Sequence, residues 1–310
     1  MFEAIIVLCL TGADGPCRDV LLPGYEASDR ASCETALDRQ FPDLTAFVAL
    51  RVAAAPHCRP AAEALPMVAV AEGVHVHRGF VEEPDGRNRG DVANLGLVIG
   101  GASVAVIDSG SARWMGEAAW RAIRNLTDLP VSHVILTHMH PDHVFGASVF
   151  EMAGADVVGH ARLPRALAER QGNYLESLGR LIGPQALLAT RAPGITRTVD
   201  GEDLIDLGNR VLDLRAWPAA HTGTDLTVFD RQTGTLFAGT WCSTPTRPRS
   251  TAVCAAGRRC WRSCRRRTSS GWCPVMARRL CPGPRGPSRW RAISRRWPAT
   301  RARRSRRASA

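Results

Sequence analysis

The heptapeptide Thr137-His138-Met139-His140-Pro141-Asp142-His143 decides how this 310-residue sequence is interpreted. The apolar run at 131–136 before it predicts a short buried strand, and the apolar spacing at 144–152 after it predicts a helix. The order strand, loop, helix places the polar residues at the carboxyl end of a buried strand. Sheets of α/β proteins present ligand-binding residues at that end, so we expect a binding site here.

The polar residues of this stretch are all of types that bind metal ions. His138, His140, Asp142 and His143 bring three imidazoles and one carboxylate within six residues. Burial of these groups without partners would be unfavourable, whereas zinc satisfies such ligands directly. We therefore predict a zinc site on this loop. The isolated histidines are interpreted as ordinary core or surface residues, namely His57, His75, His77, His133 and His160.

His221 is the expected distant ligand of this site. A catalytic zinc ion takes three protein ligands and keeps an open position for water, so the cluster needs a partner from elsewhere in the chain. His221 lies in the polar loop AHTGTD between two predicted strands. We assign His138, His140 and His221 to a first metal, and Asp142 and His143 to a second.

This ligand set implies hydrolytic chemistry. A zinc ion lowers the pKa of its bound water to about 7 and so supplies a metal-bound hydroxide at neutral pH. Asp142 is the candidate catalytic residue, because its carboxylate can orient that hydroxide and transfer protons. The predicted reaction is hydrolysis of an ester, thioester, amide or lactam bond in a small-molecule substrate, and nothing in the ligands selects among these bonds.

The rest of the central region alternates predicted strands with predicted helices. Apolar runs at 95–99 and 104–107 flank Gly100-Gly101 and predict a hairpin. Helical spacing of apolar residues covers 111–126 and 163–182. Further strands are predicted at 68–76, 155–159, 204–214, 226–230 and 235–239. An alternation of this kind fits helices layered over sheets.

Four cysteines mark the N-terminal part of the chain. They are Cys9, Cys17, Cys33 and Cys58, and no other cysteine occurs until the last 70 residues. We expect two disulfides, which require an oxidising compartment. Four buried thiols are also compatible with the pattern, and the sequence does not give the pairing.

Composition divides the chain into three parts. These are a Cys-containing module at 1–62, a metal-binding domain at 63–240 and an Arg-rich tail at 241–310, with the Ala/Pro-rich stretch 53–66 interpreted as a linker. The tail holds 20 of the 40 basic residues and none of the 29 acidic ones, so the first 240 residues carry a net charge of −9 although the whole chain carries +11. We expect the tail to be disordered.

The segments THMHPDHVFG and AHTGTD resemble the first and third metal motifs of the metallo-β-lactamase superfamily, in a match over residues 68–239. The resemblance implies an αββα sandwich, of the α/β (α+β) class, with one or two zinc ions at one edge. Members of the superfamily include lactamases, thioesterases of the glyoxalase II type, other hydrolases and several oxidoreductases.

The opening FEAIIVLCLTGADGPCRDVLLPGYEAS, followed by this metal domain, resembles the quinoprotein relay system zinc metallohydrolases. Those proteins are exported, so the resemblance implies a link to a quinoprotein dehydrogenase system and a periplasmic or secreted location. The apolar run 2–10 is too short to span a membrane and lacks the features of a signal peptide. We therefore expect no membrane span. A periplasmic or secreted location requires an export signal upstream of the given start, which this sequence does not show; without such a signal the location is unknown.

The sequence departs from the superfamily pattern at Thr240. The superfamily has an aspartate that bridges both metals after the strand at 235–239, and a later Gly-His ligand, but no histidine follows His221. One G inserted after the codon of Gly239 would turn Gly-Thr-Trp-Cys-Ser into Gly-Asp-Leu-Val-Phe. The same frame can read Val-Val-Pro-Gly-His-Gly-Pro at 272–278. We therefore expect a reading-frame slip from about Thr240, an incomplete second metal site, poor stability and little activity.

A catalytically impaired metal-binding protein is the competing interpretation. In it, the Arg-rich tail is a basic arm that binds nucleic acid or acidic partners. We favour the frame slip, because the tail contains no recognisable nucleic-acid-binding module and a basic arm would not explain the lost ligands. The expected partner is therefore a small-molecule substrate, and no nucleic acid.

Overall fold

The computed structural model describes residues 1–12, 15–242 and 253–254. All of them belong to one compact unit, residues 1–257. Almost all of the Arg-rich segment 241–310, and with it the expected frame slip and disorder, lies outside the described residues. In the part of the chain that is described, no helix is both long and apolar enough to cross a membrane.

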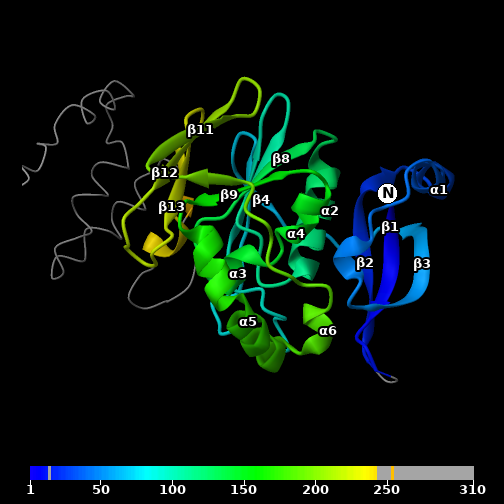
Figure 1. Cartoon of the computed structure of the whole chain (residues 1–310). Coiled ribbons are helices and arrows are strands. Elements are labelled where there is room, and N and C mark those ends of the chain that lie inside the picture. The colour runs from blue at the N-terminus through cyan, green and yellow to red at the C-terminus, as the bar shows by residue number, and fades with distance from the viewer. Residues whose placement is uncertain (13–14, 243–252, 255–310) are drawn as a thin grey trace, which may run out of the picture. The chain divides into compact units, whose positions relative to one another are not determined.

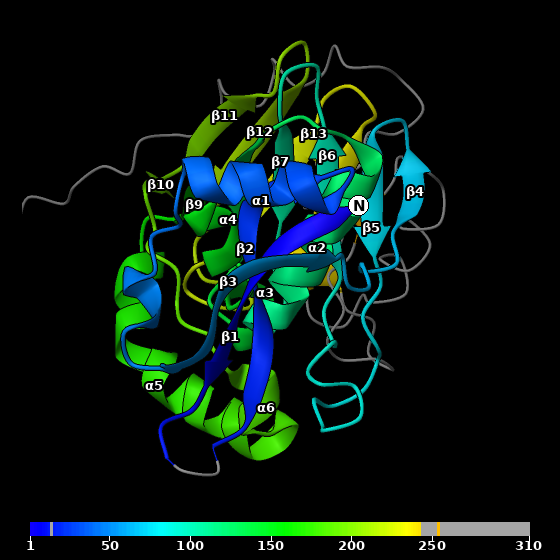
Figure 2. The ribbon, with the colours of Figure 1, turned by 90° about the vertical axis from the view of Figure 1, so that its right-hand side faces the viewer.

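The N-terminal module is a three-stranded antiparallel sheet in the order β2-β1-β3, with helix α1 packed across it (Figures 1 and 2). Its elements are β1 (Phe2–Cys9), β2 (Cys17–Ala27), α1 (Arg30–Arg39), the 3-10 turn η1 (Thr45–Phe47) and β3 (Arg51–Pro60). The interpretation of 53–66 as a linker is wrong for its first part, because residues 53–60 belong to β3. Prolines fit there, since β3 is an edge strand where a missing N–H breaks few ladder bonds.

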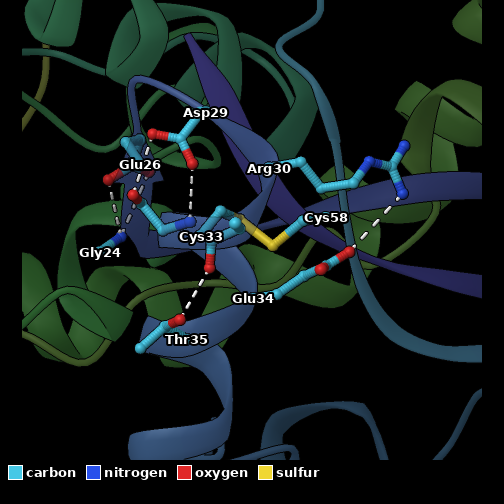
Figure 3. The surroundings of a disulfide bond; sticks show 10 residues. Gly24, Glu26, Asp29, Arg30, Cys33, Glu34, Thr35 and Cys58 are labelled. Atoms are coloured by element: carbon cyan, nitrogen blue, oxygen red, sulfur yellow. Dashed lines mark hydrogen bonds and ion pairs between the residues drawn. A yellow bond between two sulfur atoms is a disulfide. The ribbon is translucent and has the colours of Figure 1, made fainter.

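Two disulfides hold this module together. Cys9–Cys17 joins paired positions of β1 and β2, and Cys33–Cys58 ties α1 to β3 (Figure 3). The expectation of disulfides is confirmed over the alternative of four thiols. The structure also gives the pairing that the sequence left open. Such cross-links stabilise a small module mainly by restricting its unfolded chain.

The main domain is built on a seven-stranded sheet in the order β10-β9-β8-β7-β6-β5-β4. The pairs β7–β8, β8–β9 and β9–β10 are parallel, and the pairs β4–β5, β5–β6 and β6–β7 are antiparallel. The single strand expected at 68–76 is instead the hairpin β4–β5, which turns at Gly73 with φ +61°. The strands are β4 (Val68–Ala71), β5 (Val74–His77), β6 (Leu95–Ile99), β7 (Val104–Ile107), β8 (Val131–Ile135), β9 (Asp156–His160) and β10 (Arg197–Val199).

Helices cover one face of this sheet. They are α2 (Arg113–Leu126), α3 (Pro141–Val144), α4 (Ser148–Met152), α5 (Leu163–Ile182) and α6 (Pro184–Leu187). Side chains of α2, α4 and α5 share one buried cluster with strands β6 to β9. The single helix expected at 144–152 is wrong, because the chain breaks between α3 and α4 at Gly146. The backbone there passes so close to its neighbours that a Cβ on Gly146 would lie 2.0 Å from the Ser109 carbonyl oxygen.

A five-stranded antiparallel sheet packs on the other face, in the order β11-β12-β13-β14-β15. The strand expected at 204–214 is in fact the hairpin β11–β12. The elements are β11 (Glu202–Asp206), β12 (Val211–Ala216), β13 (Leu226–Asp230), β14 (Thr235–Phe237), the 3-10 turn η2 (Gly239–Cys242) and β15 (Val253–Cys254). Ile107, Ile135 and Phe237 belong to the core that lies between the two sheets.

The layers therefore follow the order helices, sheet, sheet. This confirms the predicted α/β (α+β) sandwich. A helix covering the outer face of the second sheet is not found among residues 1–12, 15–242 and 253–254. The incompleteness that the sequence predicts for the C-terminal side concerns residues outside the described ranges.

Buried ion pairs join the N-terminal module to α2. Glu3 on β1 is fully buried and accepts hydrogen bonds from Arg121 at 2.6 and 3.0 Å. Arg18 on β2 pairs with the buried Glu117 at 2.8 Å. Removing one partner of such a pair leaves a buried charge unpaired, which is strongly destabilising. The module is therefore fixed on the domain within one unit.

Candidate metal centre

The loop after β8 carries the first group of candidate ligands. Its start is fixed on both sides, because the Thr137 N–H donates to Asp108 Oδ1 at 2.8 Å and the Thr137 carbonyl accepts from the Leu226 N–H at 2.8 Å. Pro141 begins the short helix α3, so Asp142 and His143 lie on its first turn. The metal-site loop is thus attached to both sheets at the carboxyl end of β8.

Three imidazoles converge beside this loop. His140 Nδ1 lies 3.2 Å from His138 Nε2 and 3.0 Å from His221 Nε2. One ring nitrogen from each of these three residues lies within 4.8 Å of the others. The structure therefore brings the distant His221 to the histidines of the loop, as predicted.

The spacing and protonation of these imidazoles fit a zinc ion. Ligand nitrogens about 2.0–2.1 Å from a tetrahedral zinc lie roughly 3.4 Å apart, close to the separations seen here. Burial lowers the pKa of His138 well below its usual value, and burial lowers that of His140 to about 4, in both cases with help from neighbouring imidazoles. The pKa of His221 is also lowered by burial. At neutral pH these rings are uncharged and their lone pairs are free for a metal.

The tautomer of His138 follows from its contacts. The Thr137 hydroxyl lies 2.9 Å from Asp108 Oδ2 and 3.0 Å from His138 Nδ1. Since the hydroxyl donates to the carboxylate, it accepts from His138 Nδ1–H. His138 Nε2 is then the unprotonated nitrogen that faces the centre, which is the usual arrangement for a metal-binding histidine.

Asp142 and His143 form an ion pair next to the three histidines. His143 Nε2 lies 3.3 Å from Asp142 Oδ2, and His143 Nδ1 lies 2.8 Å from Asp108 Oδ2. The ring centroids of His143 and His138 are 4.2 Å apart. Burial alone would lower the pKa of His143, but the two carboxylates raise it to about 10. Against the opposing effect of burial, His143 lowers the pKa of Asp142 to about 2.

Asp108, at the end of β7, was not among the predicted site residues. It is fully buried, has φ +58°, and accepts hydrogen bonds from Thr137 and His143. The sequence feature that could have identified Asp108 is its position directly after the apolar run 104–107, at the end of a predicted strand. Because β7 and β8 are parallel neighbours, their carboxyl ends lie side by side at the metal-site loop.

The loop that carries His221 is organised by Asp225. The Asp225 carboxylate accepts hydrogen bonds from the backbone N–H groups of Ala220, His221 and Thr222, at 2.7 to 3.1 Å. The motif AHTGTD is therefore a self-capped turn that presents His221. Asp225 is a positioning residue for the histidine, a role that the sequence did not assign to it.

Thr240 lies at the edge of the centre. Its hydroxyl oxygen is 3.4 Å from His138 Nε2, and the preceding Gly239 has φ +57° and approaches Thr137. The resemblance of the sequence to the superfamily predicts an aspartate at this position. The residue that occupies it here offers a neutral hydroxyl in place of a carboxylate.

The isolated histidines have other contacts. His77 forms a buried pair with Asp91 at 2.7 Å, His133 contacts the Ser132 hydroxyl, and His160 Nε2 lies 3.2 Å from the Trp217 carbonyl. Within the described ranges, the only group of three or more side chains with metal-binding spacing is formed by His138, His140 and His221.

Comparison with known proteins identifies the fold. Residues 88–240 match the sequence model of the Metallo-beta-lactamase superfamily. This region of the chain is therefore similar to the superfamily, and the domain has the metallo-β-lactamase fold. The matched region of the metallo-β-lactamase domain includes both ligand-bearing loops and ends at Thr240.

Solved structures similar to the chain include several metallo-β-lactamases. One from Pontibacter korlensis is 16% identical with a TM-score of 0.43, and the alignment covers 57% of this chain and 71% of that one. One from Hirschia baltica is 17% identical with a TM-score of 0.44, covering 59% and 74%. The enzyme TMB-1 is 18% identical with a TM-score of 0.44, covering 59% and 73%. No curated protein matches the chain.

Proposed function

We propose that this chain is a zinc-dependent hydrolase of the metallo-β-lactamase superfamily, with His138, His140 and His221 as ligands of the first metal. One observation carries the proposal: two loops more than 80 residues apart in sequence bring three neutral imidazoles together, with their nitrogens within 4.8 Å. Zinc, when bound by such a set, acidifies water and polarises a carbonyl group. Esters, thioesters, amides and lactams are the substrate classes that this chemistry serves.

Asp142 is the proposed catalytic residue. Its carboxylate lies beside the three histidines and is ionised at neutral pH, since its pKa is about 2. An ionised carboxylate can hold a water molecule in position by accepting a hydrogen bond from it. His143 keeps Asp142 in place, because it is itself fixed by Asp108 on its other nitrogen.

The second metal position is incomplete in the described residues. Asp142 and His143 are present, but Thr240 stands where a bridging aspartate is expected. We therefore propose that the chain as written holds one zinc ion in the first position. A reading-frame slip from about Thr240 is the proposed origin of this difference, and the nucleotide sequence around Thr240 tests it directly.

We further propose that the protein is of the quinoprotein relay system type and works in the periplasm or outside the cell. The two disulfides of the N-terminal module support this location, because disulfides form and persist in oxidising compartments. Fractionation of cells expressing the gene with its upstream region, followed by thiol labelling of the four cysteines, tests the location. Finding the protein in the cytosol with reduced cysteines would refute it.

The test of the hydrolase combines metal content with turnover. The whole chain, its His221→Ala variant and its His57→Ala variant are loaded with zinc and assayed with a lactam, a thioester and an aryl ester. His57 is exposed and lies on β3, so it serves as the matched control. We expect wild type and His57→Ala to bind zinc and to hydrolyse one substrate class at a low rate, and His221→Ala to lose both properties. Turnover that persists in His221→Ala would contradict the proposal.

A catalytically impaired metal-binding protein is the second candidate function. The observation that favours it is the neutral Thr240 hydroxyl beside His138. In this case wild type would bind zinc as tightly as the first proposal requires, yet would hydrolyse none of the three substrates. The same experiment therefore separates the two functions.

A further inference from the structure

Two hydrogen bonds join the loop after β8 to the loop before β13. In the first, the Leu226 N–H donates to the Thr137 carbonyl oxygen at 2.8 Å. In the second, the Met139 N–H donates to the hydroxyl oxygen of Thr224 at 3.1 Å. The first bond uses backbone atoms alone, so it does not depend on the side chains present. The second requires a hydroxyl at position 224.

The second bond acts on a peptide group that lies between two metal ligands. Met139 separates His138 from His140 in the sequence, and Thr224 follows His221 by three residues. The orientation of the Met139 peptide group helps to set the directions in which the two neighbouring imidazoles leave the backbone. A hydrogen bond to this group can therefore influence the metal ligands without touching the metal.

The hydroxyl protons between the two loops have one consistent direction. Thr222 Oγ1 lies 2.7 Å from Asp225 Oδ1 and 3.1 Å from Thr224 Oγ1. A carboxylate only accepts hydrogen bonds, so the Thr222 hydroxyl donates to Asp225. The Thr224 hydroxyl then donates to Thr222, and its oxygen is free to accept from the Met139 N–H. The series ends at Asp225, which also accepts from the His221 N–H at 2.7 Å.

This connection is buried. Thr224 and Asp225 have only 1% and 2% of their surfaces exposed. A buried donor that loses its acceptor is costly, so buried hydrogen bonds of this kind hold the backbone in one conformation. Removing the Thr224 hydroxyl would deprive the Met139 N–H of its acceptor. The connection is therefore part of the interior of the domain, and water cannot readily replace it.

We propose that Thr224 is a positioning residue of the metal centre. Its hydroxyl connects Met139 in the first ligand loop to Asp225 in the second, and so sets the spacing of the three histidine ligands. This inference rests on the proposed function, because it takes His138, His140 and His221 as the ligands of the first zinc ion. It adds a residue that contacts neither the metal nor the substrate.

Hydrogen exchange at the Met139 amide tests the connection in the metal-free whole chain. Thr224→Val removes the hydroxyl and keeps the shape of the side chain. The chain contains six methionines, so labelling with nitrogen-15 methionine gives a simple NMR spectrum, in which Met139→Leu identifies the signal of interest. We expect the protection of the Met139 amide to fall about tenfold in Thr224→Val. Thr224→Ser, which keeps the hydroxyl, should restore it.

Zinc affinity, measured by competition with a chelator, tests the effect on the ligands. Thr224→Val should bind zinc about tenfold more weakly than wild type, which is in the range expected when an outer-shell partner of a metal site is lost. Thr224→Ser should bind zinc as wild type does. A merely structural loss would not be expected to depend on the hydroxyl in this way.

Thr235→Val is the matched control. Thr235 is buried on β14 of the same sheet, and its hydroxyl contacts that of Thr233 at 2.8 Å. This variant should keep both the Met139 protection and the zinc affinity of wild type. Unchanged zinc affinity in Thr224→Val, or an equal loss in Thr235→Val, would overturn the positioning role and leave the metal centre standing. A wild-type chain that takes up no zinc would overturn both proposals.

Discussion

Asp108 shows how a single residue connects the elements of the metal centre. It sits at the end of β7 and holds Thr137 and His143 through its buried carboxylate. The ligand types and their spacing made His138 and His221 predictable from the sequence. Asp108 was harder to predict, because its role depends on which strand lies next to β8, and one sequence does not give the strand order.

The residue at position 240 should set the number of metal ions bound. Thr240→Asp places a carboxylate near His138 Nε2, and the His138 ring is 4.2 Å from that of His143 between centroids. Carboxylates are good zinc ligands. We expect the zinc content at saturation to rise from about one to about two ions per chain relative to wild type, with the second ion bound more weakly. Thr240→Ser, which keeps the hydroxyl, should leave the content unchanged. Identical zinc content in wild type and Thr240→Asp would show that position 240 does not face the second site.

At the scale of elements, long periodic segments were the most predictable. The helix expected at 163–182 has the same bounds as α5, and the hairpin at Gly100-Gly101 is present as β6–β7. Two predicted strands, 68–76 and 204–214, proved to be hairpins. Their turn residues, Glu72-Gly73 and Gly208-Asn209, were the signal in the sequence, and the prediction passed over it. The break at Gly146 could not be predicted, since it depends on contact with Ser109, which is distant in sequence.

The turn that carries His221 should be required for tight zinc binding. Asp225→Ala removes the acceptor of three backbone N–H groups and so releases His221 from its position. We expect zinc affinity to fall roughly 10- to 100-fold, as is typical when an outer-shell partner of a metal ligand is lost. Competition with a chelator measures the change.

Asp213→Ala is the control for this variant, because Asp213 forms a surface ion pair with Arg231 on the same sheet. Its zinc affinity should equal that of wild type. A chelator titration that does not distinguish Asp225→Ala from wild type would exclude the positioning role of Asp225.

At the scale of the molecule, the N-terminal module and the metallo-β-lactamase domain behave as one unit because charged groups are buried where they meet. Glu3 and Glu117 are buried and each is paired with an arginine across the boundary. The sequence suggested a module by its cysteines, but it gave no sign of this contact. Charged residues are usually exposed, so a single sequence does not show which of them are buried against another element.

Glu3→Gln should destabilise the whole unit. The change leaves the guanidinium of Arg121 buried without its counter-charge, and such a loss costs about 3–5 kcal/mol. Urea denaturation followed by circular dichroism measures the free energy of unfolding. Glu34→Gln is the matched control, since it breaks the exposed Arg30–Glu34 pair, which is worth less than about 1 kcal/mol. Equal losses in the two variants would contradict the view that the module and the domain are coupled through Glu3.

X-ray absorption at the zinc edge of the loaded whole chain tests the central claim most directly. The account predicts three imidazole nitrogens at about 2.0–2.1 Å from the metal, and a loss of one of them in His221→Ala. The six cysteines that follow residue 240 provide the contrasting outcome. Sulfur ligands at about 2.3 Å, with a spectrum unchanged in His221→Ala, would show that zinc binds elsewhere and would contradict the metal centre proposed for His138, His140 and His221.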